Sequence, residues 1–421
     1  MDLLRSCSSG IAGPVVPARL QPGNEADRMS KNLVCGDRAM SSVPSLHIAM
    51  IGTRGVPANY GGFETCVEEV GARLADKGHA VTVYCRESYY KDRPPAYKGM
   101  DLVYLPNIEK KALDTISHTF LSMLHAAFRR YDIYMVFNAA NSPTVFIPRL
   151  LGRKVAINTD GLEWKRGKWG KIAKKYYLFS EWLSARLATR IVADSPGIET
   201  YYRERYGAQS SVIAYGAELM ETRNARLLDK FGLAPNEYFL QITRFEPENH
   251  PLLTMQAFKR LKTDKKLVLV GGVRYGSDYF KQMESELTDN IIMPGYIYDK
   301  DVLNELWCNC YAYIHGNEVG GTNPALLQTM AAGCFTIAID VPFNHDVLQD
   351  CGMYFEKSPE SLAGRMEWAL AHAGDLGPYK EKCRRRIEQY YTWARVSDQY
   401  EGLFFELAGR KEALAGKKIP K

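Results

Sequence analysis

The sequence predicts an α/β fold: two Rossmann-like domains with doubly wound parallel sheets that face each other across a cleft. Three observations support this class. The chain of 421 residues exceeds the length of one ordinary domain. From about residue 45, short apolar runs alternate with helical patterns, as in parallel βαβ units. The alternation stops over a charged stretch at residues 217–236 and then starts again, which indicates two halves joined by a linker.

The first half begins with an apolar run, Leu46–Gly52, that predicts a strand, and a helical pattern over Phe63–Lys77 follows it. Gly78 and His79 end this helix. Further strands are expected at 80–85, 102–105, 132–137, 154–159, 190–194 and 212–215, and helices at 112–130 and 168–186. The first domain is therefore predicted to span residues 45–216.

In the second half the strand pattern starts again at Tyr238–Thr243. Further strands are expected at 267–271, 291–297, 311–315 and 335–339, and helices at 251–261 and 277–287. The second domain is predicted to span residues 237–375, and charged helices over 376–421 are expected to pack back on the first domain. Residues 1–44 show no periodicity and no apolar signal core, so we expect a disordered tail.

The composition excludes several classes of protein. With 46% hydrophobic and 24% charged residues the chain is typical of globular proteins, and no apolar run approaches the roughly 18–20 residues of a membrane span. Nine cysteines without a regular framework are typical of a reduced, cytosolic protein. The net charge of +6 favours an anionic partner or surface, but it is no nucleic-acid signature, and no nucleic-acid partner is expected.

The loop after the first strand, residues 52–64, is the first candidate ligand site. Its spacing of glycines fails the dinucleotide fingerprint, and it lacks the Gly-Lys-Ser/Thr of a P-loop. Gly61 and Gly62 remain at a helix N-terminus, where backbone N–H groups favour a phosphate or a sugar oxygen, and Arg54 adds a cation. A simple tight turn is the alternative interpretation.

Two loops of the second half are also candidate sites for a phosphate or a sugar. Arg244 follows a strand, and its guanidinium can bind a diphosphate through two hydrogen bonds, although a surface charge is the alternative. Gly321, Thr322 and Asn323 precede Pro324, which fits the first position of a helix. Their N–H groups are expected to point into the cleft, unless they form a plain helix cap.

Four motifs together carry a resemblance to a known family: IGTRGVPANYGGFET, DGLEWKR, TRFEPEN and HGNEVGGTNPALLQ. They resemble the GT-B glycosyltransferases and, among these, the large retaining family numbered four. The likeness is to its rhamnosyltransferase-type branch in bacterial surface polysaccharide synthesis. It covers about residues 46–400.

The resemblance implies a hexosyltransferase that moves a sugar from a nucleoside diphosphate with retention of configuration. The best donor hypothesis is dTDP-L-rhamnose, a UDP-sugar being the other candidate, and the acceptor is a lipid-diphosphate-linked saccharide. Residues 45–216 would hold the acceptor and residues 237–375 the donor nucleotide. No cofactor and no metal ion are expected. Arg244 would hold the donor diphosphate, and Asp160 would lie near the transferred sugar, unless it serves as a helix cap.

The chain also departs from the family pattern. The family's lysine five residues after the strand-end arginine is Asn249 here, and the E-x7-E pair falls on Gly320 and Gln328. Glu318, two residues before the first of these positions, is the candidate substitute. Gln328 keeps an acceptor oxygen for a ribose hydroxyl but loses the charge-assisted part of the bond, on the order of 1 kcal/mol.

The segment 163–186 suggests a membrane surface as a partner. Lys165, Arg166, Lys168, Lys171, Lys174 and Lys175 are interleaved with Trp164, Trp169, Tyr176 and Tyr177. Basic and aromatic residues on an amphipathic helix suit anionic lipid, so we expect a cytoplasmic protein peripheral to the inner face of the cell membrane. A solvated helix face is the alternative. The helix at 112–130 is expected to belong to the core.

Two other functions stay open at this point. A GT-B nucleotide-sugar epimerase would need no membrane segment. A non-catalytic glycosyltransferase-like scaffold is favoured by Gln328 and Asn249 and opposed by the presence of Arg244, Asp160 and the Gly61–Gly62 pair.

Overall fold

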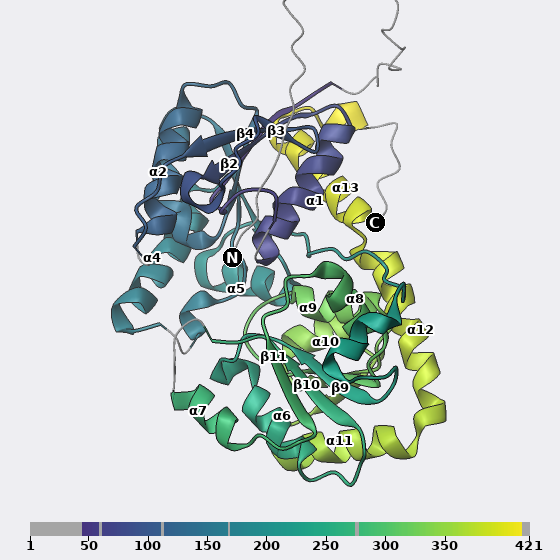
Figure 1. The fold of residues 1–421 in the computed structure, drawn as a ribbon. Helices are drawn as coiled ribbons and strands as arrows, with labels where there is room; N and C mark the ends of the chain where they lie inside the picture. The colour runs from purple at the N-terminus through teal and green to yellow at the C-terminus, as the bar shows by residue number, and fades with distance from the viewer. Residues whose placement is uncertain (1–43, 59–60, 111–112, 167–168, 274–277, 415–421) are drawn as a thin grey trace, which may run out of the picture. The chain divides into compact units, whose positions relative to one another are not determined.

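The computed structural model describes residues 44–58, 61–110, 113–166, 169–273 and 278–414 (Figure 1). The expected tail lies outside the described residues, except for Pro44. The described residues form two sheets, one of eight strands and one of six, and both belong to one compact unit, Val43–Lys421. The predicted class of two Rossmann-like parallel sheets is confirmed.

The first sheet has the strand order β3-β4-β2-β1-β5-β6-β7-β8. All neighbours are parallel except β3, which pairs antiparallel with β4. The order runs outward in both directions from β1 and β5, so the topological switch point lies between these two strands. The strands are β1 (His47–Ile51), β2 (Ala80–Arg86), β3 (Ala96–Tyr97), β4 (Met100–Leu105), β5 (Ile133–Phe137), β6 (Lys154–Asn158), β7 (Arg190–Ala193) and β8 (Ser210–Val212).

Helices cover both faces of the first sheet, because its central strands are apolar on both sides. One face packs against α1 (Gly62–Asp76) and α13 (Trp393–Leu407). The other carries α2 (Asp114–Ala127), the 3-10 segment η3 (Ala139–Thr144) and α3 (Phe146–Leu150). The helices α4 (Lys171–Leu187) and α5 (Pro196–Tyr206) connect the last strands.

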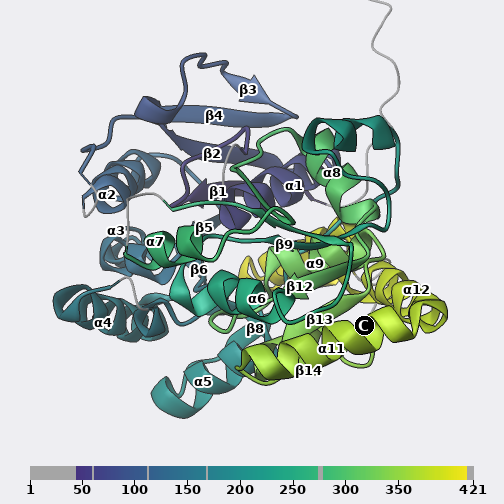
Figure 2. The ribbon, with the colours of Figure 1, turned by 60° about the horizontal axis from the view of Figure 1, so that its bottom comes forward.

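The second sheet has the order β11-β10-β9-β12-β13-β14, and all its strands are parallel. Its switch point lies between β9 and β12. The strands are β9 (Tyr238–Ile242), β10 (Lys266–Val270), β11 (Ile291–Gly295), β12 (Ala312–His315), β13 (Thr336–Ile339) and β14 (Met353–Phe355). The helices are α6 (Pro251–Phe258), α7 (Asp278–Ser285), α8 (Lys300–Cys308), α9 (Pro324–Ala331), α10 (Pro342–Leu348), α11 (Pro359–Ala371) and α12 (Leu376–Arg386). Helices α6 and α11 lie side by side on one face of this sheet (Figure 2).

The C-terminal end of the chain returns to the first sheet, where α13 lies beside α1 (Figure 1). Lys77 at the end of α1 forms ion pairs of 2.6 Å with Asp398 and Glu401. The hydroxyl of Tyr400 accepts a hydrogen bond from the Asn158 side chain at the end of β6. The first half is therefore completed by residues from the far end of the sequence.

Three strands differ from the sequence-based expectation. The strand expected at 212–215 forms instead over β8, and residues 213–215 continue as buried coil. The short edge strands β3 and β14 were not expected, because two or three residues at a sheet edge carry no alternating pattern that a sequence can show.

Candidate active site

The loops singled out by the sequence follow the strands at the two switch points. The loop with Arg54, Gly61 and Gly62 follows β1, and Arg244 follows β9. The loop with Gly321 and its neighbours follows β12, the strand next to β9. Ligands of open α/β sheets bind at the carboxyl ends of the strands beside a switch point, so the topology places all three loops where a ligand is expected.

The N-terminus of α1 lies against the N-terminus of α9. A Cβ atom built on Gly62 would lie 3.0 Å from Cγ of Pro324. Gly61 precedes α1 with φ 106°, a conformation that favours glycine. The carboxylate of Glu64 in the first turn lies beside Gly61 and accepts a hydrogen bond from the Arg54 N–H, so a negative charge lies at this helix end.

The loop before α9 joins the two halves. The Thr322 hydroxyl donates a hydrogen bond of 2.5 Å to the Asp194 carbonyl, and the Asn323 side chain caps α9 by accepting from the Ala325 N–H. For Asn323 the cap interpretation is thus confirmed. In the described part of the chain, the N–H groups of Gly321 and Asn323 have no hydrogen-bond acceptor. These two backbone groups, rather than the side chains, are available to an anion.

Arg244 is positioned by Asn249. The Asn249 amide donates to the Arg244 carbonyl at 2.9 Å, and Gln241 donates to the Asn249 carbonyl at 2.9 Å. Asn249 is buried, and its side chain fixes the loop that carries Arg244. The guanidinium of Arg244 is partly exposed, and among the described residues it has no hydrogen-bond or ion-pair partner.

Glu318 and Gln328 differ in how they are held. The Glu318 carboxylate accepts hydrogen bonds from Lys357 Nζ at 2.8 Å and pairs with His250 Nε2 at 2.9 Å. Partial burial acts to raise the pKa of Glu318, but these two partners outweigh it and leave the pKa below its ordinary value. Gln328 lies on α9, partly exposed, and its amide has no partner within the described ranges. Of the two, Gln328 is the side chain free to meet a ligand.

Asp160 lies two residues after the end of β6, with a positive φ of 59°, and donates its N–H to the Asn158 side chain. Burial, and then the neighbouring Glu163, raise the pKa of its carboxyl group, while the charges of Arg166 and Arg244 act in the opposite direction. Asp160 and Arg244 come from different halves. The charge of Arg244 therefore acts on the Asp160 carboxyl group across the two halves.

Asp194, directly after β7, is a site residue that the sequence reasoning missed. It is 1% exposed, and its carboxyl group lies against the backbone of Gly321 from the second half. Burial, and then the nearby Asp160, hold its pKa well above the ordinary value, so the group is a candidate neutral acid. The signal was available, because Asp194 follows a buried strand just as Asp160 does.

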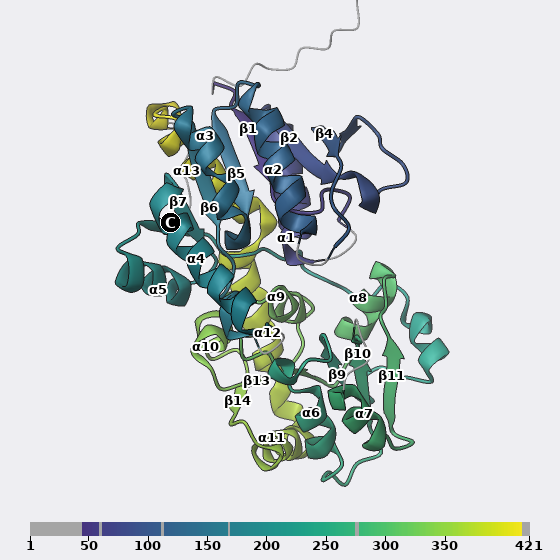
Figure 3. The same cartoon turned by 90° about the vertical axis from the view of Figure 1, so that its left-hand side faces the viewer.

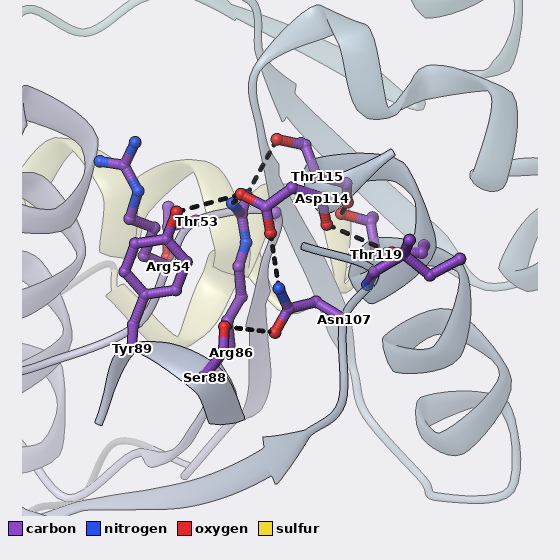
Figure 4. Close-up of polar contacts among 12 residues, drawn as sticks. Thr53, Arg54, Arg86, Ser88, Tyr89, Asn107, Asp114, Thr115 and Thr119 are labelled. Atoms are coloured by element: carbon purple, nitrogen blue, oxygen red, sulfur yellow. Dashed lines mark hydrogen bonds and ion pairs between the residues drawn. The ribbon is translucent and has the colours of Figure 1, made fainter. Parts of the chain in front are cut away.

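Arg54 belongs to a polar cluster at the carboxyl ends of β1, β2 and β4 (Figure 4). Its guanidinium carbon lies 5.2 Å from the centre of the Tyr89 ring. The buried Arg86 forms an ion pair of 2.7 Å with Asp114 and donates to Thr115 at 3.1 Å. The Arg54 guanidinium therefore lies against Tyr89, in the same cluster as the buried Arg86.

No group of three His, Cys, Asp or Glu side chains able to hold a metal ion is found in the described ranges.

Each half of the chain matches a different protein-family model. Residues 45–218 match a family model described as a domain of unknown function, DUF1972. Residues 228–393 match the model described as "Glycosyl transferases group 1". A search among curated proteins finds no match.

Solved structures share the fold. A sucrose-phosphate synthase from Thermosynechococcus elongatus is 18% identical with a TM-score of 0.72, over 86% of this chain and 99% of that one. Anabaena HepE in complex with UDP-glucose is 13% identical with a TM-score of 0.69, over 86% and 100%. WaaG, a glycosyltransferase involved in lipopolysaccharide biosynthesis, is 15% identical with a TM-score of 0.65, over 83% and 98%. The fold is therefore GT-B.

Proposed function

We propose that this chain, a glycosyltransferase with a group 1 domain in its second half, binds a nucleoside diphosphate sugar at the switch point of the second sheet. One observation carries the proposal. The guanidinium of Arg244 has no hydrogen-bond or ion-pair partner among the described residues. Arg244 follows β9, and the loop with the free N–H groups of Gly321 and Asn323 follows the neighbouring strand, β12. A guanidinium and a helix N-terminus are groups that bind a diphosphate.

The same groups explain how transfer is promoted. The bond between the anomeric carbon and the diphosphate oxygen breaks, the acceptor hydroxyl oxygen bonds to that carbon, and the hydroxyl proton passes to an oxygen of the leaving diphosphate. Negative charge grows on the leaving diphosphate, where Arg244 and the N-terminus of α9 stabilise it. Asp160, from the other half, is suited to orient the transferred sugar or the acceptor hydroxyl through its carboxyl oxygens.

The finer assignment is to the retaining family numbered four and to its rhamnosyltransferase-type branch. We propose dTDP-L-rhamnose as donor, a lipid-diphosphate-linked saccharide as acceptor, and a place at the inner face of the cell membrane. The four motifs of the sequence support this choice. HepE was solved with UDP-glucose and WaaG acts in lipopolysaccharide biosynthesis, which makes a UDP-sugar the second donor candidate.

The first experiment is a thermal-shift screen of the purified chain against dTDP, UDP, GDP and ADP, with NAD as control. A ligand at 100 times its dissociation constant stabilises by about 2.7 kcal/mol, which gives a clear shift in Tm. We expect a selective shift with dTDP that Arg244→Ala abolishes. Arg260→Ala is the matched control, since Arg260 is half exposed on the far end of the second half and pairs with Glu360.

Each outcome decides between the candidate functions. A selective shift with another nucleotide keeps the transferase and excludes the rhamnose donor. No shift with any nucleotide contradicts the proposal and favours the non-catalytic scaffold. When a nucleotide binds, release of dTDP from dTDP-L-rhamnose only in the presence of a lipid-linked saccharide supports transfer. Turnover of the nucleotide sugar without an acceptor would favour an epimerase.

A further inference from the structure

Exposed apolar side chains are concentrated on one part of the molecule. Ten of the nineteen large apolar residues that are exposed in the described ranges belong to α2, α3, α4 or the residues that end them. Three of these are almost fully exposed: Phe128 at 90%, Ile172 at 87% and Leu150 at 80%. The other seven are Phe120, Leu121, Leu124, Phe146, Leu151, Phe179 and Trp182. We call these ten residues the apolar face.

The three helices that carry the apolar face form one layer (Figure 3). Thr119 of α2 donates a hydrogen bond of 2.8 Å to Asn141 of η3. Tyr176 of α4 donates at 2.7 Å to the Ala140 carbonyl of the same segment. Because η3 runs directly into α3, it holds α2 and α4 on either side, and the ten residues share a continuous layer of helices.

The charges on this layer have one sign. Exposed basic residues flank the apolar face at Arg129, Arg130, Lys154, Lys171, Lys175 and Arg186. The three helices contain only two acidic residues, and neither presents a free charge. Asp114 pairs with Arg86, and Glu181 is buried against Tyr201 and Tyr206.

We propose that the apolar face is the surface with which the protein docks on an anionic lipid bilayer. Apolar side chains that enter the interface and cations that meet lipid phosphates are the two contributions that bind a peripheral protein. A second copy of the chain is a less suitable partner for this face, because the basic residues of the two copies would repel each other. Among the described residues, none of the helices has the length and hydropathy of a membrane-spanning segment.

This inference rests on the proposed membrane location and changes how it is achieved. The sequence assigned the contact to the aromatic residues of segment 163–186. In the structure Trp169 donates to Glu163, Tyr176 is bonded to η3, and Trp164 packs against the core, so these rings turn toward the protein. Lys168 of that segment lies outside the described residues. The helix expected as core, α2, instead exposes one whole side and joins the face.

The test is co-sedimentation of the full chain with vesicles of phosphatidylcholine containing phosphatidylglycerol, and with phosphatidylcholine alone. We expect binding to the anionic vesicles only, weakened at high salt because screening acts on exposed charges. The triple variant Phe128→Ser/Leu150→Ser/Ile172→Ser should lower the apparent affinity at least about tenfold. Its control, Leu219→Ser/Leu287→Ser/Tyr298→Ser, changes exposed apolar residues elsewhere and should bind as the wild type does.

A charge-reversal pair completes the design. Lys171→Glu/Lys175→Glu should also reduce binding at least about tenfold, whereas Lys262→Glu/Lys300→Glu, on the second half, should not. The thermal shift with nucleotide is measured on every variant, so loss of lipid binding with an intact shift separates docking from donor binding. Wild-type binding by the triple variant overturns the proposal. So does a dimer in light scattering that the triple variant abolishes, because the face would then join two copies.

Discussion

Single residues decide how closely the two loops of the candidate site approach. A Cβ atom on Gly161 would lie 2.6 Å from Gly320 Cα, and one on Gly321 would lie 1.9 Å from a carboxyl oxygen of Asp194. Both distances are shorter than non-bonded contact allows. Because the obstacle at Gly161 is backbone and that at Gly321 is a buried side chain, a methyl group would force the loops apart.

Gly321→Ala is therefore predicted to weaken nucleotide binding, since the loop that offers its N–H groups must move. Titration calorimetry with the nucleotide found in the screen measures the loss. Gly364→Ala is the control: it lies in α11 with no atom within 4 Å of a new Cβ, and it should bind normally. Adding Asp194→Ala to Gly321→Ala removes the obstacle and should restore binding. Normal binding by Gly321→Ala alone would show that the two loops are not held together in solution.

Gln328→Glu is predicted to strengthen nucleotide binding about fivefold, which corresponds to about 1 kcal/mol. A carboxylate at this partly exposed position of α9 would accept charge-assisted bonds from ribose hydroxyls that the amide accepts more weakly. The control is Gln282→Glu on the exposed side of α7, which adds the same charge elsewhere. An unchanged or weaker affinity for Gln328→Glu would show that this side chain does not contact the ribose.

At the scale of elements, α4 carries a buried acid on its inner side. Glu181 is 3% exposed and accepts hydrogen bonds from Tyr201 at 2.8 Å and Tyr206 at 3.3 Å. Burial raises the pKa of this carboxyl group to about 7, although the two tyrosine hydroxyls act to lower it. Ionisation of Glu181 therefore disfavours the folded state. The same helix presents Ile172, Phe179 and Trp182 to solvent.

The sign of the pH effect follows from proton binding. Between the ordinary pKa of 4.5 and about 7, the folded chain holds a proton on Glu181 that the unfolded chain has lost. The free energy of unfolding therefore falls as pH rises through this window, by up to roughly 3 kcal/mol. Glu181→Gln should abolish the pH dependence that Glu181 causes. In denaturant titrations, the free energy of unfolding of the variant should therefore rise relative to that of the wild type from pH 4.5 to 7. A difference that stays constant with pH would contradict the prediction.

At the scale of the whole molecule, the chain's last long helix belongs to the first half. Phe404, Phe405 and Tyr400 of α13 are buried in one apolar cluster with residues of α1 and β1. His79, at the end of α1, pairs with Glu401 at 3.2 Å. The cluster also includes Leu326 and other residues of α9, so the two sheets share part of their apolar core.

Phe404→Ala is predicted to cost about 3–5 kcal/mol of stability, although it lies outside the first half of the sequence. In hydrogen exchange, the loss of protection should appear in β1, β2 and α1. Phe335→Ala is the matched control, since Phe335 is equally buried but packs in the second sheet's cluster. In Phe335→Ala, the loss of protection from hydrogen exchange should appear in β9 to β14. If Phe404→Ala loosens the second sheet first, α13 is not the element that completes the first half.

The sequence by itself determined the class of fold and the position of its loops. Apolar runs such as Leu46–Gly52 and Tyr238–Thr243 predict buried parallel strands because both sides of such strands lie in the core. Polar residues that directly follow these runs, such as Arg244 and Asp160, could be selected because strand ends in such sheets form ligand sites. Asp194 satisfied the same rule and could have been found.

Only the tertiary structure decided what each of these side chains contacts. Asn249 binds the Arg244 carbonyl, Glu318 is held by Lys357 and His250, and α2, expected in the core, also exposes apolar side chains. The buried carboxyl group of Asp194 lies against Gly321, a residue of the other half. Local pattern reflects the periodicity of an element, whereas burial, pKa and hydrogen-bond partners depend on residues far away in the chain. These contacts are set when distant elements pack, and no spacing along the sequence encodes them.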